Sequence, residues 1–319
     1  MFLMHSSYFF KLFPPPQFLL MPYAGIDISD DAISFIEYSR PVGERTIVKH
    51  GIYPLEAGII EGGDIKNEDK LVSILLDIHN SYHLNYVKAS IPEEKAYLFE
   101  TDVPYADLRS ISQSIEFKLE ENVPLSAKDA VFSFDLLLAK QGKPMRASVS
   151  AVPQTYMDKI ISIFKKAGIT PISFETVPRA IAQIVSQSSD SDTIIIHSMK
   201  TKTGVYVVSD KAVGFTSTIS VGSEDVNPDE YAEKLEAEIS RVQTYWLSKE
   251  GDSGGEIKRV VIVGHEAERT THILRAKVND FLPIESTDIW KAVLDTTKYV
   301  PPILRSESFE YASAAGLAE

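Results

Sequence analysis

The same strand-turn-strand opening occurs twice in this chain of 319 residues, and that recurrence constrains the fold more than any other feature. The first copy covers residues 24–38, with an acidic turn at Ser29–Asp31 between two apolar stretches, and a second hairpin is expected after it over residues 44–52. The second copy starts at Thr193 and continues with two further strand patterns to residue 219. Apolar residues that alternate with a period of two indicate half-buried strands, and polar residues between them indicate turns. The sequence therefore predicts two α/β domains that begin alike.

The predicted domain boundaries follow changes in texture along the chain. Between Pro92 and Pro153, a strand, an amphipathic helix and two more strands form a unit of their own, which predicts a small inserted α+β subdomain. The polar run Gln187–Asp192 is the expected linker between the domains. The predicted parts are an N-terminal tail (1–22), a first domain (23–190) with the inserted subdomain (92–150), a second domain (193–305) and a C-terminal helix that returns to the first domain (306–319).

The N-terminal tail is aromatic, but it is not expected to span a membrane. Pro14, Pro15 and Pro16 break any helix there, and the apolar runs on either side are far shorter than the ~20 residues that cross a bilayer. Two interpretations stay open. Residues 1–20 are either a weak interfacial anchor or an upstream extension of a protein whose natural start is Met21, and the second is favoured.

Composition excludes several classes of function. The chain has 45 acidic and 32 basic residues, a net charge of −13, and its lysines and arginines are scattered, so nucleic-acid binding is not expected. It contains no cysteine, which excludes disulfides, thiolate metal sites and a cysteine nucleophile and fits a reducing, cytoplasmic compartment. A hydrophobic share of 44% with 24% charged residues is typical of a globular protein.

Four stretches together carry a resemblance to a known family. They are Tyr23–Ile28, then Ile115–Pro124 followed by Phe134–Asp135, then Phe164–Pro171 through Glu175, and finally Tyr311–Ala318. In this order and spacing they resemble the PilM family of type IV pilus assembly proteins. That family lies in the actin-like ATPase superfamily and is related to the cell-division protein FtsA.

The resemblance implies both a fold and a function. The expected fold is α/β, with duplicated actin-like (ribonuclease H-like) domains and a small SHS2-like inserted subdomain. The expected function is that of a cytoplasmic adapter at the inner face of the cytoplasmic membrane, which binds the short N-terminal peptide of a PilN-like membrane protein. Membrane contact would come through that partner or through residues 1–20, and self-association stays open. The chain ends directly after Gly316–Ala318, without the amphipathic extension of the division protein, which favours the adapter.

The resemblance also places a nucleotide cleft between the two domains. Its candidate residues are Asp27, Ser29, Asp30, Thr201, Thr203, Glu175 and Gly264, and its candidate cofactor is ATP with Mg²⁺. In this superfamily, glycine-containing hairpin turns bring backbone N–H groups close to phosphates, and an acidic residue organises the metal ion and water.

Each element of that cleft departs from the family pattern. In the first turn, Ser29 stands at the glycine position and Asp31 at that of a small hydroxyl residue, so that a carboxylate would face the triphosphate. In the second turn, His197 stands at the acidic position and Met199 at the glycine, and His265 replaces a glycine after Gly264. We therefore predict no catalytic residue, no metal site and no hydrolysis.

For several of these residues, a purely structural role is favoured over a role in binding or catalysis. Lys200, Thr201, Lys202 and Thr203 read as a solvated hairpin turn that could still contact an anion. His197 and His265 read as loop histidines rather than a metal pair, because no carboxylate stands at ligand spacing. Glu175 could cap the helix expected at Pro178. Two rival functions remain: an active ATPase that closes on Mg-ATP, and a division-type protein that polymerises at the membrane.

Overall fold

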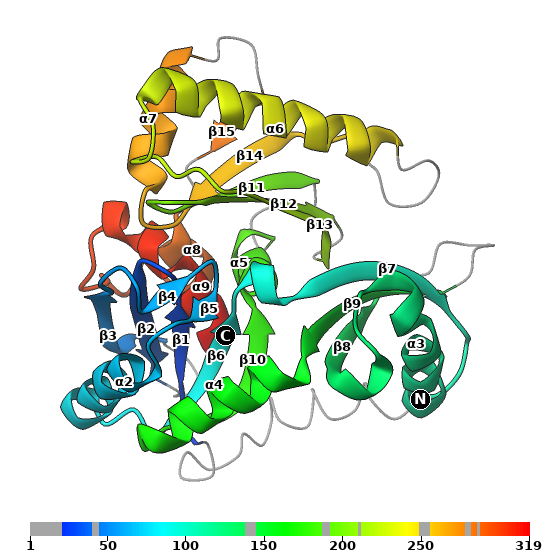
Figure 1. The fold of residues 1–319 in the computed structure, drawn as a ribbon. Coiled ribbons are helices and arrows are strands. Elements are labelled where there is room, and N and C mark those ends of the chain that lie inside the picture. Colours follow the sequence, from blue (N-terminus) through cyan, green and yellow to red (C-terminus); the bar gives the residue numbers. More distant parts are fainter. Residues whose placement is uncertain are drawn as a thin grey trace.

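The computed structural model describes residues 21–39, 45–137, 145–186, 192–209, 212–248, 256–277, 282–285 and 288–319. Both predictions for the N-terminal tail fall on residues 1–20 and therefore lie outside the described residues, as does most of the expected linker. Two mixed sheets form the centres of two lobes, and a smaller sheet lies beside them (Figure 1).

The first lobe is built on a five-stranded sheet with the order β10-β6-β1-β2-β3. β1, β2 and β3 are antiparallel, whereas β6 and β10 run parallel to β1. The strands are β1 (Ala24–Ile28), β2 (Ala32–Tyr38), β3 (Ile47–Pro54), β6 (Tyr86–Ile91) and β10 (Thr170–Thr176). A hairpin expected over residues 44–52 is instead the single outer strand β3, because Ile47 and the residues from Lys49 to Pro54 pair with β2, with an irregularity at Val48.

The second lobe repeats this arrangement with the order β13-β12-β11-β14-β15. Its first three strands are again antiparallel, and the last two are parallel to the first. The strands are β11 (Thr193–Ser198), β12 (Thr203–Ser209), β13 (Ala212–Ile219), β14 (Arg259–Val263) and β15 (Ile284–Glu285). Two sheets with one shared strand order confirm the predicted duplicated, actin-like fold.

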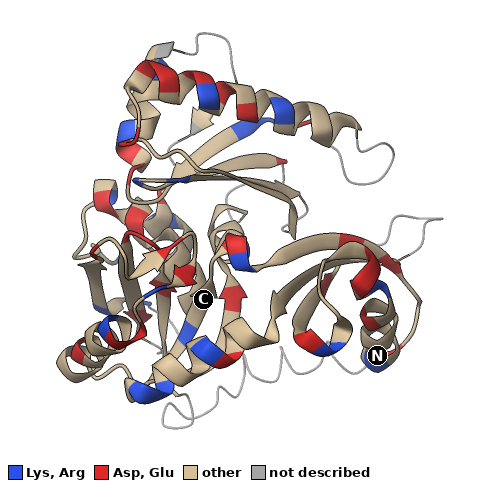
Figure 2. Cartoon of the chain, viewed as in Figure 1, with Lys and Arg blue, Asp and Glu red and all other residues tan. Residues whose placement is uncertain are grey.

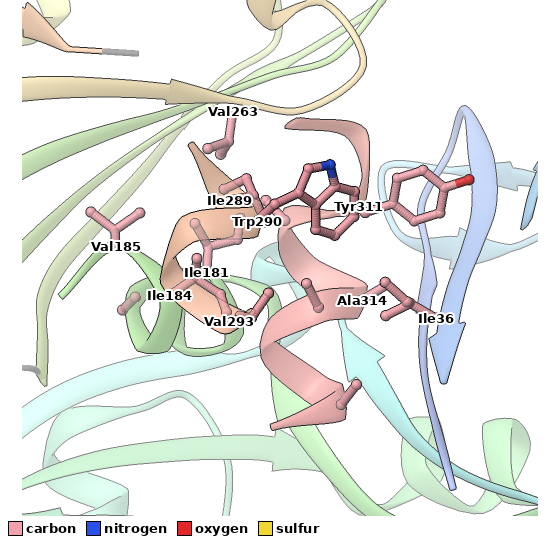
Figure 3. Packing of buried hydrophobic residues seen from close by; sticks show 14 of the residues in the cluster. Ile36, Ile181, Ile184, Val185, Val263, Ile289, Trp290, Val293, Tyr311 and Ala314 are labelled. Carbon is pink, nitrogen blue, oxygen red and sulfur yellow. The ribbon is translucent and has the colours of Figure 1, made fainter. Parts of the chain in front are cut away.

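Helices cover both faces of each sheet. The outer face of the first sheet packs against α2 (Glu68–Tyr82) and α4 (Gln154–Lys166), and the outer face of the second against α6 (Pro228–Ser248) and α7 (Ala267–Lys277). Between the sheets lie α5 (Val177–Val185), α8 (Ile289–Val293) and α9 (Ala312–Ala318), preceded by η4 (Arg305–Tyr311). This central cluster contains residues of both lobes, including Ile36, Val263 and Trp290 (Figure 3). The lobes therefore share one core.

The inserted subdomain is a three-stranded antiparallel sheet with one helix packed on it. Its sheet has the order β7-β9-β8, formed by β7 (Tyr97–Val103), β9 (Met145–Pro153) and β8 (Ala130–Leu136), and its helix is α3 (Leu108–Asn122). Ile111, Ile115 and Leu119 of α3 are buried against apolar residues of the sheet. The opposite face of the sheet turns toward α5 and β13 (Figure 1). Two short helices, η2 (Glu93–Lys95) and η3 (Ala127–Asp129), complete the subdomain.

Charge is spread over the whole molecule. Figure 2 shows Asp and Glu on all of its parts, and α6 carries acidic and basic residues together. Among the described residues, no helix has the length and hydrophobicity that crossing a membrane requires.

Candidate functional site: the cleft between the lobes

The two hairpin turns expected to hold phosphate meet directly across the cleft. The first turn joins β1 to β2, and the second joins β11 to β12. The carboxylate of Asp31 accepts a hydrogen bond from the backbone N–H of Lys200 at 2.8 Å. A backbone N–H of this turn is the kind of donor that would face a phosphate. In this chain, a side chain of the opposite lobe is its acceptor.

Asp30 is held in a second cradle of backbone N–H groups. The N–H of Gly62 donates to one carboxylate oxygen at 2.7 Å, and the N–H of Gly63 donates to the other at 3.0 Å. Both glycines turn the hairpin between β4 (Ile60–Glu61) and β5 (Asp64–Ile65) with positive φ, a conformation that favours glycine. The carboxylate is therefore oriented by its own lobe toward the opposite one.

Lys202 joins the lobes from the other side. Its ammonium pairs with the carboxylate of Glu94 and lies 3.5 Å from that of Asp30. The residue is only 6% exposed. Burial by itself would lower its pKa, but Glu93, Glu94 and Asp30 raise the pKa above its ordinary value. The interpretation of this segment as a solvated turn is therefore wrong at Lys202.

Glu93, Tyr206 and His197 form a chain of hydrogen bonds beside this ion pair. The hydroxyl of Tyr206 donates to Glu93 at 2.9 Å, and Nδ1 of His197 lies 3.2 Å from the same hydroxyl. His197 is a buried residue of β11 and not a loop residue as expected, and burial lowers its pKa to about 3. Burial and the neighbouring Glu94 raise the pKa of Glu93 to about 7. The site therefore holds a neutral histidine next to a weakly acidic carboxyl.

Asp27 lies near the end of β1 and takes no part in the hydrogen bonds and ion pairs described above. It is 5% exposed, and its Oδ1 is buried without a hydrogen-bond partner among the described residues. Burial raises its pKa, and Ser90 and Ser313 oppose that shift. Within the described ranges, no group of three or more His, Asp or Glu side chains is arranged to hold a metal ion.

The remaining predicted residues have structural contacts of their own. The hydroxyl of Ser29 accepts from the N–H of Ala32, within its own turn. The Thr203 hydroxyl donates to the carbonyl of Val221, whereas Thr201 is exposed. Glu175 accepts from the N–H of Thr176 and pairs with Arg179 of α5. Gly264 has φ of 103° and donates to the carbonyl of Phe309.

A Mg-ATP complex does not fit this cleft as the residues stand. The N–H of Lys200 donates to Asp31, and Lys202 is neutralised by the carboxylates of Glu94 and Asp30. A triphosphate would have to displace the carboxylates of Asp30 and Asp31, and its negative charge would be repelled by theirs.

Several residues of the cleft belong to no sequence pattern that predicts a site. Glu93 and Glu94 lie at the start of the inserted subdomain, and Gly62 and Gly63 lie in a stretch whose sequence indicates only a glycine-rich loop. The paired glycines before a short strand could have indicated a tight hairpin. No local pattern indicates that this hairpin holds Asp30.

The raised pKa of Glu93 predicts a specific pH dependence of stability. The folded chain keeps this carboxyl protonated up to about pH 7, whereas the unfolded chain ionises it near 4.5. Its contribution is therefore complete below pH 4.5 and is lost as pH rises to 7. We expect Glu93→Gln to raise the free energy of unfolding at pH 8 by up to about 2 kcal/mol and to have little effect at pH 4.

Urea denaturation at both pH values measures this effect. Glu120→Gln on the exposed side of α3 is the control, and it is expected to change neither value. An equal effect of Glu93→Gln at pH 4 and pH 8 would contradict the assignment.

No protein-family model matches the sequence. A search of curated proteins found no match either. Solved structures do match: a chain of the PilM-PilN type IV pilus biogenesis complex is 15% identical, with 95% of this chain and 98% of that chain covered at a TM-score of 0.75.

Two further structures are more distant. The cytoplasmic domain of EpsL, an inner-membrane component of the type II secretion system of Vibrio cholerae, is 11% identical, with 92% and 94% of the chains covered at a TM-score of 0.49. A Bacteroides thetaiotaomicron protein with an actin-like ATPase fold and unknown function is 10% identical, with 85% and 94% covered at 0.47. The chain thus has the actin-like α/β fold, and over nearly its whole length it is similar to a chain of the PilM-PilN complex.

Proposed function

We propose that this protein is a non-catalytic adapter in the inner-membrane platform of a type IV pilus or a related secretion machine. It would lie at the cytoplasmic face of the membrane and bind the short cytoplasmic N-terminal peptide of a PilN-like membrane protein. The likeness to a chain of the PilM-PilN complex supports this function. Membrane contact would then come through the partner.

The observation that carries the proposal is a pocket where the inserted subdomain, α5 and β13 meet. It is a partly open hollow, whose space of about 400 Å³ includes the open solvent in front of it. First-lobe, inserted and second-lobe residues all contribute to its wall. The lining residues are Glu93, Ala96, Leu98, Asp135, Ser148, Ser150, Thr176, Pro178, Arg179, Val213 and Thr216.

The chemistry of this wall suits an extended peptide. Ser148 and Ser150 point from the face of β9 opposite α3, because alternate residues of a strand face opposite sides. Leu98 and Val213 add apolar surface, and several hydroxyl groups can bond a peptide backbone. β8 and β10, which contribute Asp135 and Thr176, are both outer strands of their sheets. An outer strand can take up an extended peptide through its free backbone groups.

Arg179 is the cation of this wall, and its orientation is fixed. It pairs with Asp135 of the inserted subdomain at 2.7 Å and with Glu175 near the end of β10. The guanidinium therefore ties α5 to β8 at the edge of the pocket. Such a rigid wall binds with a smaller loss of conformational entropy than a mobile one.

The closed cleft favours the adapter over an active ATPase. Peptide binding needs no nucleotide, and the two turns that would hold phosphate are joined by the chain's own side chains. Calorimetric titration with the N-terminal peptide of the membrane protein encoded beside this gene tests the proposal. Binding in the absence of ATP is the expected result.

A variant that fills the pocket gives the sharper test. Ser150→Tyr places a ring where the peptide would lie, and we expect it to weaken binding at least about tenfold. Val131→Tyr is the matched control, because Val131 is 40% exposed on β8 and does not line the pocket. Equal binding by Ser150→Tyr and the unsubstituted chain would exclude this pocket, and no binding by either would refute the proposed function.

A further inference from the structure

The contacts across the cleft share one feature, which is that carboxylates of the first lobe meet donors of the second. Asp31 accepts from the N–H of Lys200, Asp30 and Glu94 face the ammonium of Lys202, and Glu93 accepts from the hydroxyl of Tyr206. Each first-lobe group is an anion or an acid, and each second-lobe group is a donor. This is the arrangement that a phosphate between the two lobes would produce.

We propose that the carboxylates of Asp30 and Asp31 act as a built-in ligand, which occupies the phosphate position and holds the two lobes closed without a nucleotide. Two observations support this role for Asp30. Two backbone N–H groups of the first lobe donate to its carboxylate. The same carboxylate lies 3.5 Å from the ammonium of Lys202 in the second lobe. The N–H groups of Gly62 and Gly63 thereby form an anion cradle whose anion belongs to the chain.

Asp31 closes the second half of the site. Its carboxylate joins residues 169 positions apart in the sequence, and it accepts from a backbone N–H of the second turn, a kind of donor that also binds phosphate. Removal of both carboxylates leaves the donors of Gly62, Gly63 and Lys200 without these acceptors, and leaves Lys202 with one carboxylate fewer. A free anion of the phosphate class would then find donors from both lobes.

The test measures the distance between the lobes. Because the chain has no cysteine, Asp69→Cys on α2 and Glu236→Cys on α6 allow specific spin labelling at two exposed positions. We expect a narrow distance distribution that Mg-ATP does not change. The additional pair Asp30→Ala/Asp31→Ala should broaden the distribution, and inorganic pyrophosphate should narrow it again.

Calorimetry with pyrophosphate provides the second readout. We expect Asp30→Ala/Asp31→Ala to bind pyrophosphate at least about tenfold more tightly than the unsubstituted chain, because two repelling charges are lost. Asp77→Ala/Glu268→Ala removes two exposed carboxylates from α2 and α7 and so controls for net charge. This control should leave both the distance and the affinity unchanged.

Three results would overturn the proposal. The first is a change in the distance distribution of the unsubstituted chain on addition of Mg-ATP. The second is an unchanged distance distribution in the folded double variant. The third is equal pyrophosphate affinity of the double variant and the unsubstituted chain. If the double variant does not fold, Asp31→Ala alone decides, because it loses the Lys200 contact and keeps the buried pair of Lys202 with Glu94. A partial broadening is then expected, and none would refute the built-in ligand. Because no peptide enters this experiment, its failure is separate from failure of the adapter function.

Discussion

Gly316→Val is expected to lower the free energy of unfolding by at least about 3 kcal/mol. A Cβ at this position would lie 1.9 Å from the carbonyl oxygen and 2.6 Å from the carbonyl carbon of Ala180, which are backbone atoms of α5. Because α5 cannot yield as a side chain would, α9 must move away from the shared core. Urea denaturation followed by circular dichroism measures the loss.

A control distinguishes this clash from the general effect of valine in a helix. Ala237→Val lies on the exposed face of α6, where only the modest helix propensity of valine counts. We expect that variant to lose less than about 1 kcal/mol. Similar losses in the two variants would mean that α9 does not pack as closely on α5 as the structure has it.

The reason for so large an effect lies in the position of α9. Every residue of this helix is buried, and it contacts β1 and α5. Gly25 of β1 allows the same close approach from the sheet, because its Cβ would lie 2.0 Å from the carbonyl oxygen of Ala314. Small residues on both sides thus let the last helix pack close to the first strand.

Lys202→Met is expected to destabilise the chain by about 3–5 kcal/mol. The substitution keeps much of the side-chain volume but leaves the carboxylates of Asp30 and Glu94 in the cleft without their cation. An unpaired charge in a buried position costs far more than the net value of the pair. Thermal and urea unfolding at pH 7.5 would measure the effect.

A double variant separates the ion pair from other roles of Lys202. Lys202→Met/Glu94→Gln removes both partners, and we expect it to be less destabilised than the sum of the single variants by at least about 1 kcal/mol. Lys234→Met, which breaks the exposed pair with Glu230 on α6, should cost less than about 0.5 kcal/mol. Additive losses at Lys202 and Glu94 would show that the two do not interact in solution.

The two sheets could be predicted from the sequence because each strand has a local pattern of alternating apolar residues. The alternation in 24–38 and in 193–219 reports which face of each strand is buried, and neighbouring strands pair through short turns. The same reasoning failed at 44–52, where a second hairpin was expected. The alternation there is the same whether the two halves of the segment pair with each other in a hairpin or the segment pairs as one strand with β2.

The candidate site was harder to predict because its contacts are not local. Lys202 stands in a polar turn, and its neighbours in sequence indicate exposure, but Glu94, 108 positions away, covers and pairs with it. His197 was read as a loop residue for the same reason, although β12 buries it. The departures of Ser29 and Asp31 from the family pattern were visible in the sequence, whereas the donors that now meet Asp30 and Asp31 were not.

By itself, the sequence determined the duplicated α/β fold, the inserted subdomain pattern and an acidic first turn, because periodicity and turn chemistry act over a few residues. Only the tertiary structure decided what that acidic turn meets. Asp30 and Asp31 could have faced solvent, a metal ion or repelled phosphate, and each choice is compatible with the local pattern. Burial and pairing across the cleft depend on residues far apart in the chain, and packing of the two lobes on α5 and α9 brings those residues together.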